Sequence, residues 1–140
     1  MRFVKRFIAL SSSLLISVFS LSLVFAQDAS GSNVPFTAEQ LEQGTEKYAA
    51  HCAACHGGEL EGGAFPALKG EAFQNKWGGE SLNDLHTYIM ENMPLGQAGV
   101  LSEEEYLDVL ALILSHNGVE AGDTELTADV VADYELPAAP

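Results

Sequence analysis

The chain has 140 residues, a length typical of one domain, and carries six Lys or Arg against 20 Asp or Glu, a formal charge of −14. This excess of acid excludes nucleic-acid binding, which depends on Lys and Arg neutralising phosphates. It also disfavours docking on an anionic membrane surface.

The first 26 residues are typical of an export signal. Three bases, Arg2, Lys5 and Arg6, precede an uncharged, mostly apolar run from Phe7 to Phe25, and Ala26 completes a small-residue cleavage site. Cleavage would leave three bases against 20 acids, a formal charge of −17, in the periplasm or another exported compartment. An uncleaved N-terminal anchor is the alternative, because the run is long enough to cross a bilayer, although its serines weaken it as a span.

The next element is a helix that leads into the two cysteines. Thr37 is a good N-cap, and Gln40 stands three positions later, where it can close a capping box. A helix is therefore expected from about Ala38 onward. A hydrophobic staple of Phe36 with Leu41 supports this start.

The two cysteines stand in His51-Cys52-Ala53-Ala54-Cys55-His56, and Cys-x-x-Cys-His is the attachment signal of a c-type haem. Residues at i, i+3 and i+4 share one face of a helix. Two thiols can therefore bond the haem vinyl groups while the His56 imidazole binds the iron.

Three other interpretations of the cysteines are weaker. A thioredoxin-like redox pair belongs to a βαβ context that this chain lacks, and it would leave the histidine without a task. A zinc site needs four ligands, and no second Cys or His pair at finger spacing follows. A plain structural disulfide is the third alternative.

The glycine-rich segment from Gly57 to Gly79 is predicted to be a loop, long enough to wrap around a cofactor. A second helix follows, because Ser81 offers another N-cap and Leu82, Leu85 and Ile89 form an apolar stripe that ends before Pro94.

A third helix begins after Ser102, where Glu103, Glu104 and Glu105 complete a strong capping signal. Its inward side chains are predicted to be Tyr106, Leu107, Leu110, Ile113 and Leu114, with Asn117-Gly118 as the stop. We therefore divide the chain into a signal peptide (1–26), an N-terminal lead (27–36), a main domain (37–118) and an acidic C-terminal tail (119–140) whose far end is expected to be irregular.

These features together resemble the small, soluble, His/Met-ligated monohaem cytochromes c of class I. The resemblance covers roughly residues 37–126 and implies an all-α cytochrome c fold, with three to four helices and loops wrapped around one covalently bound haem c. The run from Ser115 to Leu126 is also similar to the tail of cytochromes that work with quinoprotein dehydrogenases.

The resemblance assigns further residues. In this family a glycine on the first helix lets the last helix cross closely, with an aromatic residue four positions later, and Gly44 and Tyr48 match. Pro66 occupies the place of a proline whose carbonyl accepts from Nδ1–H of the iron-binding histidine. Trp77 would donate its indole N–H to a haem propionate, although a plain core role remains open. Lys69 or Lys76 could pair with a propionate, but solvated lysines are the expected case.

The second axial ligand has five candidates: Met90, Met93, His51, His86 and His116. Met93 is preferred because it precedes Pro94, which biases its backbone toward an extended conformation, and because the family's ligand commonly sits in a Met-Pro pair. Met90 is expected to fill the core, and His86 is the main competitor.

A His/Met haem has no open iron site, so the resemblance implies electron transfer and not catalysis. The uncharged run from Met93 to Leu101 is a candidate contact patch for redox protein partners, which would present a basic surface to this acidic chain. Two alternatives remain: a haem sensor or peroxidase-like enzyme with a dissociable methionine, and a permanent cytochrome subunit of a dehydrogenase complex.

Overall fold

The computed structural model describes residues 34–138, and this part of the chain folds into six helices with only two isolated β-bridges. In chain order the helices are α1 (Ala38–His51), α2 (Ala53–His56), α3 (Gly70–Trp77), α4 (Leu82–Asn92), α5 (Glu103–His116) and α6 (Ala128–Val131). The all-α prediction is confirmed. The expected signal segment lies outside the described residues, and no helix within 34–138 is long and apolar enough to cross a membrane.

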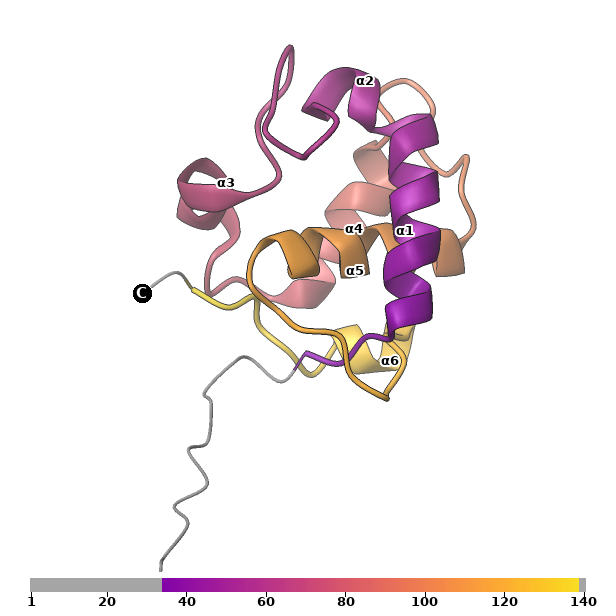
Figure 1. The fold of residues 1–140 in the computed structure, drawn as a ribbon, viewed down its shortest axis with the longest axis vertical. Helices are drawn as coiled ribbons and strands as arrows, with labels where there is room; N and C mark the ends of the chain where they lie inside the picture. Colours follow the sequence, from indigo (N-terminus) through magenta and orange to yellow (C-terminus); the bar gives the residue numbers. More distant parts are fainter. Residues whose placement is uncertain (1–33, 139–140) are drawn as a thin grey trace, which may run out of the picture.

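Helices α1 and α5 begin as the sequence predicts and cross closely (Figure 1). Thr37 and Ser102 each close a full capping box, with Gln40 and Glu105 as the third helical residues. A Cβ atom added to Gly44 would lie 2.0 Å from the Asp108 carbonyl oxygen. Glycine is therefore required where α1 meets α5, although it costs a helix about 1 kcal/mol relative to alanine.

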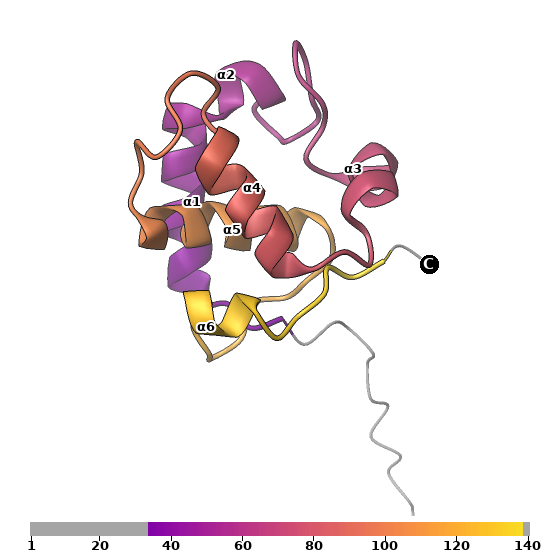
Figure 2. The same ribbon diagram turned by 180° about the vertical axis from the view of Figure 1, so that it is seen from behind.

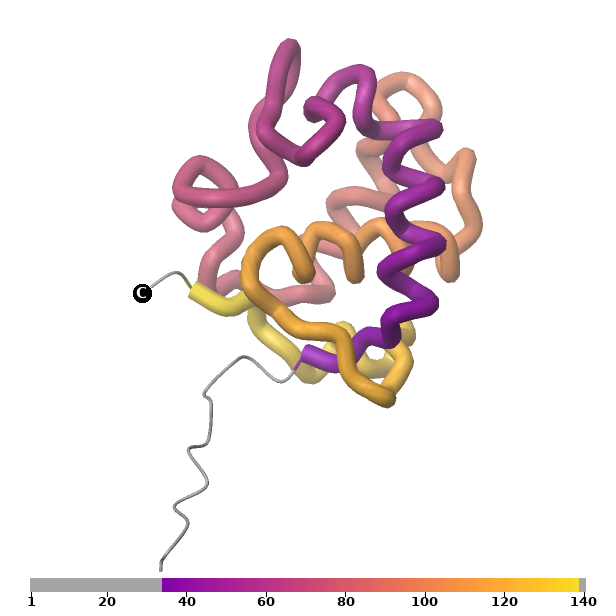
Figure 3. Tube along the Cα trace, in the orientation of Figure 1, coloured from indigo at the N-terminus to yellow at the C-terminus, as the bar shows by residue number. Residues whose placement is uncertain are grey.

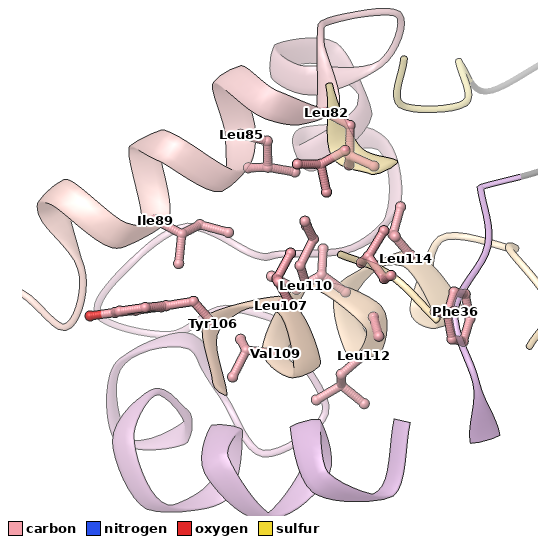
Figure 4. Close-up of a cluster of buried hydrophobic side chains, with 14 of the residues drawn as sticks. Phe36, Leu82, Leu85, Ile89, Tyr106, Leu107, Val109, Leu110, Leu112 and Leu114 are labelled. Atoms are coloured by element: carbon pink, nitrogen blue, oxygen red, sulfur yellow. The ribbon is translucent and has the colours of Figure 1, made fainter. Parts of the chain in front are cut away.

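Helix α5 forms the centre of the core. Its residues are buried without interruption from Tyr106 to Leu114, as expected for a helix covered on all sides. Seen from behind, α4 lies across α5 (Figure 2). Leu82, Leu85 and Ile89 point from α4 toward α5, while Val109 and Leu112 lie on its α1 side (Figure 4). The predicted inward residues of both helices are buried.

The glycine-rich segment differs from the prediction, because its second part is helix α3 and not loop. The glycines mark the ends of this helix: Gly70 begins it, Gly78 caps it and Gly79 follows with a φ of 78°. The intervening run contains no glycine and buries Phe73. A high glycine count over the whole segment concealed a short helix with glycine at its boundaries.

The C-terminal segment is also more ordered than expected. Its backbone is largely irregular, but residues 119–138 pack along the body of the protein beside the starts of α1 and α4 (Figure 3). The Leu126 backbone and the Gln40 side chain exchange two hydrogen bonds, and the Leu136 N–H donates to the Glu80 carbonyl. Four apolar residues spaced along the segment are buried: Val119, Leu126, Val131 and Leu136. The high acid content of the segment masked these buried apolar residues when the sequence was considered alone.

Candidate cofactor site

The site residues predicted from the sequence surround one cavity of about 320 Å³. Cys52, Cys55, His56, Pro66, Trp77 and Met93 all line it. The remaining lining is mostly apolar and comes from the loop after α2 and from α3, α4 and α5, including Leu68, Phe73, Ile89 and Ile113. The volume falls within the range of about 300–1,000 Å³ that is typical of ligand pockets. A polar hollow of about 670 Å³ beside Asp108 holds none of these residues.

Cys52 joins α1 to α2, and Cys55 and His56 lie in the single turn of α2. The backbone N–H groups of Cys55 and His56 both donate to the Cys52 carbonyl, at 3.0 Å each, which holds the turn in shape. Both thiols are free. Burial, followed by the charge of Cys55, raises the pKa of Cys52 to about 11. A nucleophilic redox thiol has a lowered pKa, so the burial of Cys52 disfavours this residue as the nucleophile of a thioredoxin-like pair.

His56 is buried and held by a hydrogen bond from its Nδ1–H to the Pro66 carbonyl, at 2.7 Å. Since a carbonyl oxygen only accepts, Nδ1 carries a proton, and in the neutral imidazole Nε2 then keeps its lone pair. The neighbouring loop is fixed by the Tyr48 hydroxyl, which donates to the Gly57 carbonyl at 2.6 Å. His56 is thus oriented and in the tautomer suited to bind a metal through Nε2.

Met93 follows α4 and reaches the cavity from an extended backbone, with φ −124° and ψ 147°. The Tyr106 hydroxyl donates to the Met93 carbonyl at 2.7 Å and accepts from the Gly99 N–H at 3.0 Å. Tyr106 therefore ties both ends of the Met93 loop to α5. The sequence predicts Tyr106 only as a core residue. A buried tyrosine hydroxyl generally needs a hydrogen-bond partner, and this rule was the signal that could have indicated its second role.

The other ligand candidates are placed less favourably. Met90 packs against the core and does not line the cavity, and the same is true of buried His86. His86 Nε2 has no hydrogen-bond partner among the described residues, and burial lowers the pKa of this side chain. His116 is exposed away from the cavity, whereas His51 lines it from the cysteine-bearing turn.

These residues fit a haem. The cavity supplies two thiols and an oriented imidazole from one turn, a thioether from a separate loop, and apolar walls. Within residues 34–138 no group of three or more His, Cys, Asp or Glu side chains is arranged to hold a metal ion. Two thiols, an imidazole and a thioether are donors that suit a c-type haem.

Comparisons with known proteins agree with this arrangement. The family described as Cytochrome C oxidase, cbb3-type, subunit III matches residues 39–113. Thiosulfate dehydrogenase of Stutzerimonas stutzeri (strain A1501) is 38% identical over 84 residues, which cover 54% of this chain and 27% of that protein. The chain therefore spans about a quarter of the length of this curated relative.

A solved structure shares the fold. The crystal structure of the sulfane dehydrogenase SoxCD from Paracoccus pantotrophus aligns with a TM-score of 0.60 and 24% sequence identity, covering 75% of this chain and 61% of that one.

Proposed function

The chain belongs to the family described as Cytochrome C oxidase, cbb3-type, subunit III, which makes it a small cytochrome c, and from this premise we propose that it carries single electrons in an exported compartment. The observation that carries the proposal is the one cavity lined by Cys52, Cys55, His56 and Met93. Thiols and ligands from distant parts of the chain meet there, on walls suited to an apolar ring system.

In this proposal Cys52 and Cys55 hold one haem c by thioether bonds, and His56 Nε2 and the Met93 sulfur bind its iron. The bound haem supplies one-electron oxidation and reduction at the iron. With both His56 and Met93 holding the iron, no iron site would remain for a substrate, so the protein would act as a carrier and not as an enzyme. Pro66 orients the histidine, Tyr106 holds the methionine loop, and the apolar lining excludes water.

The contact surface for redox partners is an apolar rim at the cavity mouth. The exposed large hydrophobic side chains of the described residues are Tyr88, Leu95 and Val100, with Leu95 67% exposed. Tyr88 and Leu95 also line the cavity, so a partner seated on them would approach the cofactor closely. Because the chain is strongly acidic, we expect a partner with an apolar centre and basic surroundings, guided by long-range attraction.

The electron donor is proposed to be a dehydrogenase. The relative from Stutzerimonas stutzeri is named for thiosulfate, which favours a donor that oxidises an inorganic sulfur compound. The tail from Ser115 to Leu126 instead resembles cytochromes of quinoprotein dehydrogenases. Second-order reduction rates with purified enzymes of both classes distinguish these donors, and an oxidase is the expected acceptor.

Visible spectra of the oxidised and reduced protein, with and without carbon monoxide, test the carrier function. We expect the weak far-red band of iron–thioether ligation in the oxidised protein, and a reduced spectrum that carbon monoxide leaves unchanged. Binding of carbon monoxide to the wild-type protein at neutral pH would contradict the proposal and favour a sensor or peroxidase-like enzyme. Met93→Ala should remove the band and open the iron; Met90→Ala is the matched control.

A further inference from the structure

The charged side chains that line the cavity differ from those of the chain as a whole. The chain has 20 Asp and Glu residues, yet none of those within residues 34–138 lines the cavity. Residues 34–138 contain three lysines and no arginine. Of these lysines, Lys47, Lys69 and Lys76, only Lys76 lines the cavity. In a chain this acidic, a wall without carboxylates and with one lysine favours a ligand that itself carries negative charge.

Lys76 is held by aromatic rings. Its Nζ lies 4.7 Å from the centroid of the Trp77 ring and 4.5 Å from that of Tyr88. The two rings pack against each other with centroids 5.3 Å apart, which brings the end of α3 beside the middle of α4. Lys76 is exposed, as the sequence predicts, and its ammonium group also lies against two aromatic rings.

The ammonium group keeps its donors for another partner. Within residues 34–138 Lys76 makes no ion pair, because the salt bridge found there joins Lys47 to Glu105. Aromatic faces attract the ammonium group through its charge and leave its N–H donors available for an acceptor. Trp77 lines the cavity too, and no hydrogen bond in the described part of the chain uses its indole N–H.

We propose that Lys76, positioned by Trp77 and Tyr88, binds the carboxylate groups of the haem; this inference rests on the proposed function. Haem has an apolar ring with two propionate side chains, and the apolar walls and single base of the cavity match this division. A fixed positive charge near the iron favours the reduced state, whose net charge is lower by one positive unit. Lys76 therefore also raises the reduction potential.

The test compares the midpoint potentials of purified holoprotein variants. Lys76→Gln should lower the potential measurably, Lys76→Arg should restore it, and Lys69→Gln, with the same loss of charge off the cavity wall, should change it much less. The difference between the wild type and Lys76→Gln should shrink as salt rises, since salt screens exposed charges. Wild-type potential in Lys76→Gln would overturn the inference, even if transfer to a partner slows.

A second variant keeps the inference testable if Lys76→Gln assembles poorly. Tyr88→Leu removes one of the two rings and should shift the potential in the same direction by a smaller amount; an unchanged potential would contradict the positioning role. Failure of the proposed function is distinguishable, because a wild-type protein without haem has no potential to measure. A normal haem spectrum with no shift in either variant refutes the assignment of Lys76 alone.

Discussion

Replacing Tyr106 by phenylalanine tests how the Met93 ligand is held in place. The change removes one oxygen atom and keeps the aromatic ring of a residue that is only 2% exposed. That oxygen donates to the Met93 carbonyl at 2.7 Å and accepts from the Gly99 N–H at 3.0 Å. Both ends of the loop therefore lose their tie to α5 while the core keeps its packing.

The size of the effect follows from these two hydrogen bonds. Each is worth about 0.5–1.5 kcal/mol net, and a buried partner left unsatisfied costs about 1–3 kcal/mol. Gly99 is exposed and Met93 is partly buried, so water can replace some of the loss. We expect Tyr106→Phe to destabilise the closed loop by about 1–3 kcal/mol, which raises the open fraction about 5- to 150-fold.

The assay follows the far-red iron–thioether band during denaturant titration, together with helix content by circular dichroism. In Tyr106→Phe the band should disappear at lower denaturant than the helices, and carbon monoxide should bind the reduced form faster than in the wild type. Tyr48→Phe is the matched control, because it loses a 2.6 Å hydrogen bond to Gly57 on the histidine side. If both variants lose the band only on global unfolding, Tyr106 does not hold the ligand loop.

Three further predictions concern packing, pH and partner docking. Gly44→Ala should lower the melting temperature by about 10 °C or more through overpacking, while Gly122→Ala, with nothing within 4 Å of its added Cβ, should not. Burial and nearby carboxylates raise the pKa of Asp108 to about 6, so the folded protein favours the protonated carboxyl group. The stability that this group contributes at low pH is lost as pH rises through that value. Asp108→Asn should therefore gain stability relative to the wild type between pH 4 and pH 7 in urea titrations. Leu95→Glu should slow electron transfer from a dehydrogenase without changing the spectrum, and the wild-type rate should fall steeply as salt rises.

The sequence predicted features that depend on neighbouring residues. The capping boxes at Thr37 and Ser102 depend on pairs of side chains three positions apart. The shared face of the Cys-x-x-Cys-His residues follows from the period of one helical turn. Gly44 was predicted through the family resemblance, and the close crossing with Asp108 explains it sterically. In each case the relevant information lies within a few residues or in a known motif.

Features that depend on distant segments were not predictable from these patterns. The Tyr106 hydroxyl bonds a residue 13 positions away, and the rings around Lys76 come from different helices. Helix α3 was hidden because its bounding glycines dominated the composition of the segment. The order of the C-terminal segment depends on apolar residues such as Leu136, whose partners lie elsewhere in the fold.

Extraction of the purified, coloured protein with acidified acetone tests the central claim most directly. If Cys52 and Cys55 carry the haem through thioether bonds, the colour stays with the precipitated chain. Single Cys52→Ala and Cys55→Ala variants should yield little holoprotein, because the haem fills the cavity that the core surrounds. Release of all the colour from the wild-type chain into the acetone would contradict covalent attachment, and with it the account of this protein as a c-type electron carrier.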